Sequence, residues 1–227
     1  MKRLFDFMLS LIGIIVLMPL ITVFSILIWF QDFKSPFYVA DRVGKHGKLF
    51  RMIKFRSMIV NASSSGVDST ADDDNRITNI GKVVRKFKID EIPQLFNVFL
   101  GQMSFVGPRP NVLNETNLYS KVENKILTVR PGITDFSSIV FSDEGDILKG
   151  SKNPDLRYNQ IIRPWKSRLA IIYIENQSLL IDIKLIIWTI LGIINKRLVL
   201  KNITNFLINI DCDQRLINTC KRDKELE

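Results

Sequence analysis

An uncharged apolar run near the N-terminus limits what this chain can fold into more than any other feature. Residues 7–30 contain no charged side chain for 24 positions, and they follow Lys2, Arg3 and Asp6. About 20 apolar residues suffice for a helix to span a bilayer. The run is too long for a signal peptide, and no small-residue cleavage site follows it. The sequence therefore predicts a helix embedded in a membrane.

Pro19 lies near the middle of this run and argues against a simple crossing. Its ring removes the backbone hydrogen bond to Ile15 and favours a kink. Each arm then has about twelve residues, or roughly 18 Å, which reaches about half-way across the hydrocarbon core. Basic residues flank both ends, so the positive-inside bias places both ends in the cytoplasm. We predict a re-entrant helix–break–helix over residues 1–30, with a single spanning helix as the alternative.

The excess of positive charge restricts the partners of the chain. The formal net charge is +9, with 32 Lys and Arg residues against 23 Asp and Glu residues. Anionic lipid head groups and a phosphorylated substrate both fit this charge. Nucleic acid is not expected, because no basic stripe interleaved with aromatic residues and no recognised motif is present. The two cysteines lie in a polar tail and imply no disulfide framework.

The residue pattern after the apolar run predicts a mixture of strands and helices. Residues 35–58 alternate polar and apolar around a glycine-flanked turn, which is typical of a β-hairpin. Residues 61–75 are predicted to be a loop, and residues 79–88 a helix. Apolar residues recur at helical spacing over residues 179–194, where Asp182 and Lys184 favour an amphipathic helix that packs or lies on the membrane.

A carboxylate pair, Asp90 and Glu91, stands just before Pro93 and close to Arg85. Pro93 suits the first turn of a helix that Gly101 ends, so the pair would lie at a helix N-terminus. The helix dipole there favours carboxylates and attracts phosphate. Phosphoryl transfer needs a nucleophile or base, a cation-binding group and fixed positive charge, and this region offers all three. The alternative is an acid pair that only stabilises the turn.

Fixed positive charge is expected from a proline-flanked arginine. Arg109 lies between Pro108 and Pro110, which restrict its backbone. A guanidinium binds phosphate through two parallel hydrogen bonds, so Arg109 is a candidate for binding a substrate phosphate. A surface turn is the alternative for this loop. The further candidates for phosphate binding, each of which could instead form a salt bridge or face lipid, are Lys54, Arg56, Arg85 and Arg130.

Together these segments resemble the small polyprenyl-phosphate phosphoglycosyl transferases, the monotopic bacterial sugar transferase family. The resemblance runs from the first residues to about Leu200. The matching segments are Lys54-Phe55-Arg56-Ser57-Met58, Asp74-Asn75-Arg76-Ile77-Thr78, Ile80-Gly81, Arg85, the stretch from Asp90 to Val98, the stretch from Gly101 to Pro110, and Arg130-Pro131-Gly132-Ile133-Thr134.

The resemblance implies a mostly helical α+β fold, with a re-entrant N-terminal helix, interfacial amphipathic helices and a small cytoplasmic catalytic domain. The expected segments are residues 1–30 in the membrane, residues 31–200 as the catalytic domain, and residues 201–227 as a tail of unknown role. Two departures stand out. Met18 precedes Pro19 where the family usually has serine, so a hydroxyl contact that would fix the bend is expected to be missing. Residues 135–146 also differ from the family pattern, in a region expected to contribute to sugar choice.

The resemblance also implies a reaction, the transfer of a sugar-1-phosphate from a UDP-sugar to undecaprenyl phosphate with release of UMP. Asp90 is expected to attack the sugar-bearing phosphate and form a covalent intermediate. Asp90 and Glu91 are expected to hold Mg²⁺. The alternatives are a ternary-complex transferase, in which Asp90 acts only as a base, and a non-catalytic basic membrane scaffold.

The expected location is the bacterial inner membrane, with the catalytic domain facing the cytoplasm. There the reaction would begin the assembly of a surface polysaccharide such as capsule, exopolysaccharide or lipopolysaccharide. The expected partners are a UDP-sugar, undecaprenyl phosphate and inner-membrane lipids. Downstream glycosyltransferases and a second copy of the chain are further candidate partners.

Overall fold

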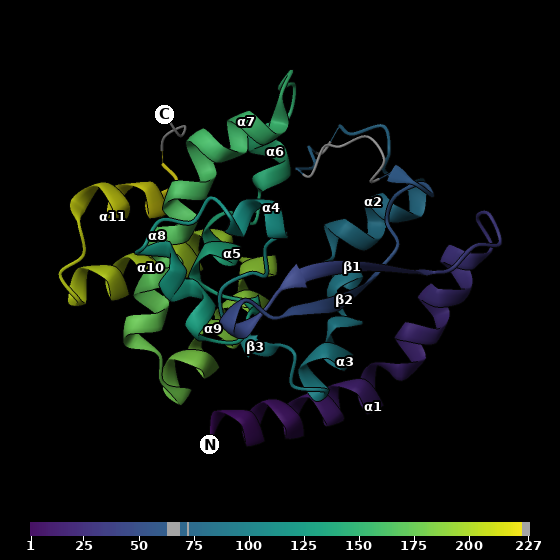
Figure 1. Cartoon of the computed structure of the whole chain (residues 1–227), viewed down its shortest axis with the longest axis horizontal. Coiled ribbons are helices and arrows are strands. Elements are labelled where there is room, and N and C mark those ends of the chain that lie inside the picture. The colour runs from purple at the N-terminus through teal and green to yellow at the C-terminus, as the bar shows by residue number, and fades with distance from the viewer. Residues whose placement is uncertain (63–68, 72, 224–227) are drawn as a thin grey trace. The chain divides into compact units, whose positions relative to one another are not determined.

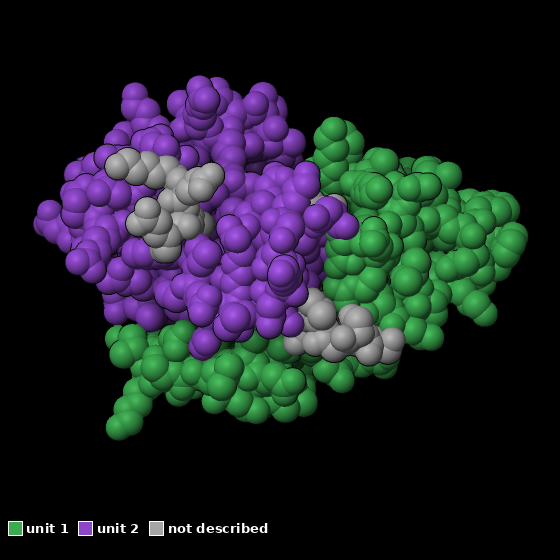
Figure 2. Space-filling model, turned by 90° about the horizontal axis from the view of Figure 1, so that it is seen from above, with its two compact units in different colours: residues 1–66, 74–133 green, residues 67–73, 134–227 purple. Residues whose placement is uncertain are grey.

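The computed structural model describes residues 1–62, 69–71 and 73–223, and the chain forms two compact units (Figures 1 and 2). Unit 1 comprises residues 1–66 and 74–133, and unit 2 comprises residues 67–73 and 134–227. Among the described residues helices predominate, and the strands form two small two-stranded sheets. The predicted α+β, mostly helical class is confirmed.

Unit 1 contains the N-terminal helix, the hairpin and the carboxylate pair. Its helices are α1 (Lys2–Trp29), α2 (Asn79–Lys86), α3 (Gln94–Phe99) and α4 (Leu113–Thr116). Its strands are β1 (Phe37–Val43), β2 (Leu49–Phe55), β3 (Ser104–Val106) and β4 (Gly132–Thr134). Short 3-10 helices occur at η1 (Lys45–Gly47), η3 (Ile89–Glu91) and η4 (Glu123–Thr128).

Helix α1 is continuous through Pro19, which differs from the predicted helix–break–helix. The proline removes one backbone hydrogen bond, yet the helix does not end there. Figure 1 shows that α1 is bent along its length. The Thr22 hydroxyl donates to the Met18 carbonyl at 3.0 Å. This contact reaches one turn back along the helix, and it does not involve the Ile15 carbonyl, whose helical hydrogen bond Pro19 removes. The expectation that no hydroxyl fixes the bend, as a serine would, stays a prediction.

Most of the surface of α1 is apolar and uncovered. Leu4 and Val16 are both 67% exposed, while Ile21 and Ile28 pack in a core with Phe55. Within the described part of the chain, α1 is the one helix that is long and apolar enough to cross a membrane. Its association with a membrane fits this exposure, since exposed apolar surface of this extent is unfavourable in water. Re-entry into the same membrane face stays a prediction.

The polar start of α1 is anchored to α3 and β3. The Arg3 guanidinium donates to the carbonyls of Val98 and Phe99, at the C-terminal end of α3, at 2.6 Å each. The buried Asp6 carboxylate accepts from the Ser104 hydroxyl at 3.1 Å and from the next backbone N–H at the same distance. The charged side chains of Arg3 and Asp6 therefore fix the N-terminal end of α1 to α3 and β3.

The predicted hairpin is confirmed as an antiparallel pair of β1 and β2, with η1 as its turn. Its register places Tyr38 opposite Lys54 and Arg42 opposite Phe50. Side chains alternate between the two faces of a strand, so these four residues share one face. Phe50 on that face is buried in a core cluster that includes Val98 of α3.

Asn97 fastens α3 to the edge of β2. Its amide donates to the Arg51 carbonyl at 2.7 Å and to the Gln102 side chain at 2.6 Å. Its amide oxygen accepts from the Ile53 backbone N–H at 3.0 Å. Asn97 is fully buried, so these bonds satisfy groups that have no access to water. The side chain thereby fixes β2 relative to the carboxylate pair that precedes α3.

Two glycines allow the backbone of the proline loop to pack closely. A Cβ atom on Gly132 would lie 2.1 Å from the Gly107 nitrogen, which no side chain could tolerate. The Gly132 N–H donates to the Pro108 carbonyl at 2.9 Å. This contact fixes the start of the loop that carries Arg109.

Unit 2 is entirely helical outside its connecting segments. Its elements are α5 (Phe136–Val140), α6 (Glu144–Leu148), α7 (Pro154–Arg157), a π-helical turn η5 (Tyr158–Ile162), α8 (Arg163–Asn176), α9 (Leu179–Ile194), α10 (Lys196–Asn209) and α11 (Gln214–Lys221). Helix α5 packs against α8, α9 and α10. Helix α10 runs across residue 200, where the sequence suggested the end of the catalytic domain.

Helix α9 has the predicted bounds, but its Asp182 side chain is buried and not on the outer face. Asp182 is buried and accepts from the Tyr173 hydroxyl at 2.6 Å, so it does not contribute a polar outer face. Leu180 and Ile190 are 62% and 59% exposed. The outer face of α9 is therefore more apolar than the sequence indicated. The helix packs against α5 and α10, and a position of its outer face on the membrane stays a prediction.

A second acid pair, Asp143 and Glu144, is held by cations rather than by solvent. Asp143 contacts Lys196 and Arg222 at 3.0 Å each, and Glu144 pairs with Lys166. Because these partners lie far away in the sequence, local spacing gives no sign of the ion pairs. Of the predicted loop over residues 61–75, positions 63–68 and 72 lie outside the described residues.

Replacing Asn97 with alanine is expected to destabilise the chain by about 3 kcal/mol. The substitution removes the hydrogen-bond partner of the Arg51 carbonyl and of the Ile53 backbone N–H. Chemical unfolding in detergent measures the change. The control is Asn114→Ala on the exposed surface of α4, where we expect a change within about 0.5 kcal/mol. Equal stability of the two variants would contradict the role of Asn97.

Candidate active site

The carboxylate pair lies where the backbone turns from α2 into α3. Lys88 adopts a left-handed conformation with φ of 57°, which redirects the chain after α2. Asp90 and Glu91 follow in the short helix η3, and Pro93 directly precedes α3. The predicted position of the pair at the N-terminus of a helix is confirmed. A lysine in this conformation is strained, so the surrounding packing must hold the turn.

Two cations hold Glu91. The Arg109 guanidinium lies 2.6 Å from Glu91 Oε1, and the Lys54 ammonium lies 3.4 Å from the same oxygen. Only 12% of the Glu91 side chain is exposed. Burial alone would raise the pKa of Glu91, but the charges of Arg109, Lys54 and Lys88 outweigh it and hold that pKa below its ordinary value. Glu91 is therefore a fixed anion at neutral pH.

Lys54 is the most strongly shifted base of this group. Burial is the main cause that lowers the pKa of Lys54 to about 8, and the charge of Arg109 lowers it further. Glu91 and Asp90 oppose this shift, while Arg42 adds to it. The pKa of Lys54 thus reflects mainly its burial, and the neighbouring charges modify the shift.

Asp90 differs from its neighbour because nothing binds its carboxylate. Within the described part of the chain, no side chain or backbone N–H hydrogen-bonds to it. Burial raises the pKa of Asp90, and the charge of Glu91 raises it further, against the opposing charges of Lys54, Arg85 and Arg109. An ionised oxygen without protein donors retains its lone pairs, so Asp90 is the carboxylate available to react or to bind a ligand.

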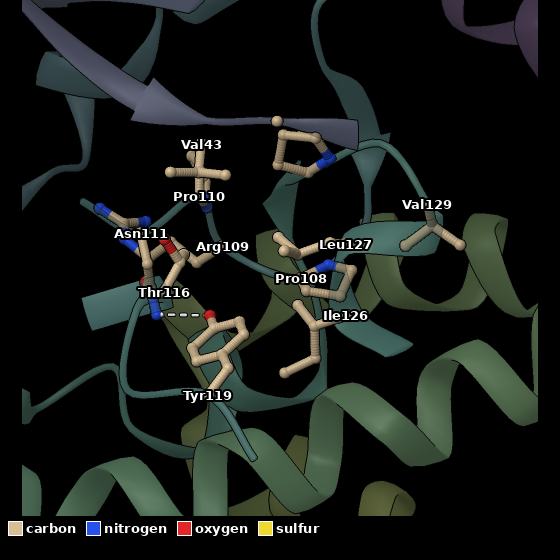
Figure 3. A pocket seen from close by; sticks show the side chains of 12 residues that line it. Val43, Pro108, Arg109, Pro110, Asn111, Thr116, Tyr119, Ile126, Leu127 and Val129 are labelled. Carbon is tan, nitrogen blue, oxygen red and sulfur yellow. Dashed lines mark hydrogen bonds between the residues drawn. The ribbon is translucent and has the colours of Figure 1, made fainter. Parts of the chain in front are cut away.

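The loop that carries Arg109 lines a small pocket (Figure 3). Pro108 and Pro110 line it together with Val43, and the Asn111 amide donates to the Tyr119 hydroxyl at 2.9 Å. The pocket lies beside the backbone of the loop, whereas the Arg109 guanidinium donates a hydrogen bond to Glu91. The structure thus brings Arg109, a predicted phosphate-binding residue, to Glu91 of the predicted carboxylate pair.

The other predicted phosphate-binding residues are placed differently. Arg85 is near enough to lower the pKa of Asp90. Arg56 is buried and pairs with Asp32 at 2.6 Å, directly after α1. Arg130 donates to the Gly101 carbonyl at 2.9 Å, beyond the C-terminal end of α3, whereas the carboxylates precede its N-terminus. The structure therefore groups Lys54, Arg85 and Arg109 with the acids, and gives Arg56 and Arg130 contacts that support the fold.

Sequence reasoning did not single out Asp6, Asp32 or Asn97. Each binds a residue more than 20 positions away, so no local spacing could reveal the contact. For Asp6 one signal was present, because a carboxylate at the start of an apolar run requires a partner if it is buried.

The carboxylate pair fits a magnesium ion that is shared with a substrate. Among the described residues, no three His, Cys, Asp or Glu side chains cluster as a complete metal site. Mg²⁺ commonly takes one or two carboxylates and completes its shell with phosphate oxygens and water. Asp90 has free oxygens for such a role, and Glu91 adjoins it.

Comparisons with known proteins define the family. The bacterial sugar transferase family matches residues 1–196. The exopolysaccharide production protein ExoY of Sinorhizobium fredii (strain NBRC 101917 / NGR234) is 33% identical over 206 residues, which cover 83% of each chain. This chain therefore belongs to the bacterial sugar transferase family, as the resemblance indicated.

Two further relatives carry more specific names. A Bacillus subtilis (strain 168) protein named "Putative undecaprenyl-phosphate N-acetylgalactosaminyl 1-phosphate transferase" is 47% identical over 109 residues, 48% of this chain and 61% of that protein. The UDP-N-acetylgalactosamine-undecaprenyl-phosphate N-acetylgalactosaminephosphotransferase of Aeromonas hydrophila is 33% identical over 192 residues, 83% of this chain and 42% of that protein. The chain thus spans less than two thirds of either relative.

Replacing Glu91 with glutamine is expected to lower the pKa of Lys54 below 8, because it removes the anion that most favours the charged ammonium. NMR titration of the lysine side chains measures the shift, and Lys54→Arg assigns the signal. Asp41→Asn, on the other face of the hairpin, serves as the control and should leave the pKa of Lys54 near 8. A wild-type Lys54 that titrates near 10.5 would contradict the geometry.

Proposed function

We propose that the chain transfers a sugar-1-phosphate from a UDP-sugar to undecaprenyl phosphate, through a covalent phosphosugar on Asp90. The names of its relatives support both substrates, since they include undecaprenyl phosphate and, for the Aeromonas protein, a UDP-sugar. The single observation that carries the proposal is the difference between two adjacent carboxylates. Glu91 is bound by two cations, whereas none of the described residues donates a hydrogen bond to Asp90.

The reaction proceeds in two displacements at one phosphorus atom. In the first, an Asp90 carboxylate oxygen bonds to the sugar-bearing phosphorus, and the bond from that phosphorus to the bridging oxygen breaks, so that UMP departs. In the second, an oxygen of undecaprenyl phosphate bonds to the same phosphorus, and the Asp90 carboxylate departs. Two steps avoid a direct encounter between an anionic acceptor and an anionic diphosphate. No oxidant or further reactant is required.

The residues around Asp90 have separate tasks in this scheme. Glu91 holds Arg109 and Lys54 beside the nucleophile, so that their charges meet the phosphate oxygens. Arg85 adds positive charge from α2. Mg²⁺ held by Asp90 and Glu91 would neutralise the phosphates and the departing UMP. The substrate phosphates approach a nucleophile whose own negative charge is thereby balanced.

The membrane setting follows from α1. Its exposed apolar side chains suit insertion from the cytoplasmic face of a bacterial inner membrane, with Pro19 at the bend. Unit 1 would then meet the phosphate of undecaprenyl phosphate at the membrane surface and the UDP-sugar from the cytoplasm. This would be the first membrane step of a surface polysaccharide, and later glycosyltransferases would use the product.

Single turnover without the lipid acceptor distinguishes this route from a ternary complex. The protein is mixed with each of a panel of UDP-sugars labelled in the β-phosphate, and the intact protein is analysed by mass spectrometry. We expect UMP release and a phosphosugar on Asp90 with the accepted donor. Asp90→Asn should form no adduct and should lower kcat by about 10³-fold or more. Release of UMP only when undecaprenyl phosphate is added would indicate a ternary complex.

The control variant is Asp41→Asn, whose carboxylate is exposed on β1 and opposite Arg51. It should form the adduct at the wild-type rate. Full turnover by Asp90→Asn, with deamidation excluded by mass, would overturn the covalent route. A wild-type protein that releases no UMP from any donor would instead favour the non-catalytic scaffold.

A further inference from the structure

Arg42 lies on the same face of the hairpin as Lys54. The register pairs Arg42 with Phe50 and Tyr38 with Lys54, and strand positions two apart point to the same side. Phe50 on this face is buried in the cluster that contains Val98 of α3. The face therefore points toward the element that follows the carboxylate pair, and Arg42 is only partly exposed there.

The backbone next to Arg42 is tied to the Arg109 loop. The Val43 N–H donates to the Asn111 carbonyl at 2.9 Å, so β1 runs directly beside the loop. Val43 also lines the pocket under this loop together with Pro110, as Figure 3 shows. Val43, which makes both contacts, directly follows Arg42 in the chain. Arg42 and Arg109 thus belong to one local structure.

No carboxylate neutralises Arg42 within the described part of the chain. Its guanidinium donates only to the carbonyl of the preceding residue, Asp41, at 2.9 Å. By contrast, Arg56 pairs with Asp32, and Arg109 pairs with Glu91. Around the carboxylate pair the cations are Arg42, Lys54, Arg85, Lys88 and Arg109, so positive charge exceeds negative charge by three. Such an excess is unfavourable until an anion enters.

We propose that Arg42 binds a phosphate oxygen of the substrate beside Arg109 and Lys54. The proposal rests on the proposed function for the identity of the substrate, and it adds a residue that the sequence did not single out. A guanidinium suits this task because it presents several N–H donors in a plane. The phosphate belongs either to the UDP-sugar or to undecaprenyl phosphate, and kinetic constants for each substrate separate the two sources.

Arg42→Gln is compared with Arg51→Gln, a matched change on the same hairpin. Arg51 is exposed and lies opposite Asp41, on the face that points away from Lys54. We expect Arg42→Gln to raise KM for one substrate about tenfold, as the loss of a charged hydrogen bond implies. The value of kcat should change less than threefold, and Arg42→Lys should recover part of the affinity. Arg51→Gln should stay near the wild type.

A direct binding assay keeps this test separate from the proposed function. Inorganic diphosphate is titrated into the full-length wild-type chain and both variants in detergent, and binding is followed by calorimetry. Weaker binding by Arg42→Gln than by Arg51→Gln supports the anion site, even if no UDP-sugar is turned over. Wild-type values of KM and diphosphate affinity in Arg42→Gln would overturn the proposal. A wild type that binds diphosphate but shows no turnover would count against the proposed function alone.

Discussion

The ion pair between Glu91 and Arg109, reinforced by Lys54, is the interaction on which the candidate site depends. It joins three segments that are distant in the sequence: the turn before α3, the proline loop and the end of β2. Glu91 therefore gathers positive charge beside Asp90, while no described residue hydrogen-bonds to the Asp90 carboxylate. Its oxygens are thus open to a substrate phosphorus or a metal ion instead of being occupied by side chains of the protein.

Helix α3 connects this chemistry with the membrane helix. At its N-terminal end it follows the carboxylate pair, and at its C-terminal end its carbonyls accept hydrogen bonds from Arg3 of α1. Asn97, within the helix, fixes β2 and thus Lys54. The distance between α1 and Asp90 is therefore set by one short element. This suits a reaction in which one substrate is anchored in a bilayer and the other is dissolved.

Local pattern was sufficient to predict much of this arrangement. The alternation around residues 44–47 predicted the hairpin, Pro93 and Gly101 predicted α3, and apolar spacing predicted α9. Contacts between distant residues could not be predicted in this way. The ion pairs of Asp143 are one example, because its partners, Lys196 and Arg222, lie more than 50 positions away. Arg42 was overlooked for the same reason, since its place beside the Arg109 loop depends on the strand register.

The helix at Pro19 shows a different limit. A proline removes one hydrogen bond, and whether the helix then breaks or bends depends on what else the local backbone can bind. In this chain α1 continues from Lys2 to Trp29 with Pro19 inside it, an outcome that the sequence pattern alone did not predict.

Separate titration of the two neighbouring carboxyl groups tests the central claim most directly. Carbon-13 NMR can follow the side-chain carboxyls of Asp90 and Glu91 in the full-length chain, with Asp90→Asn and Glu91→Gln to assign the signals. The account predicts that the pKa of Asp90 lies above its ordinary 3.8 and that the pKa of Glu91 lies below its ordinary 4.5. Ordinary values for both groups, or the reverse order, would contradict it.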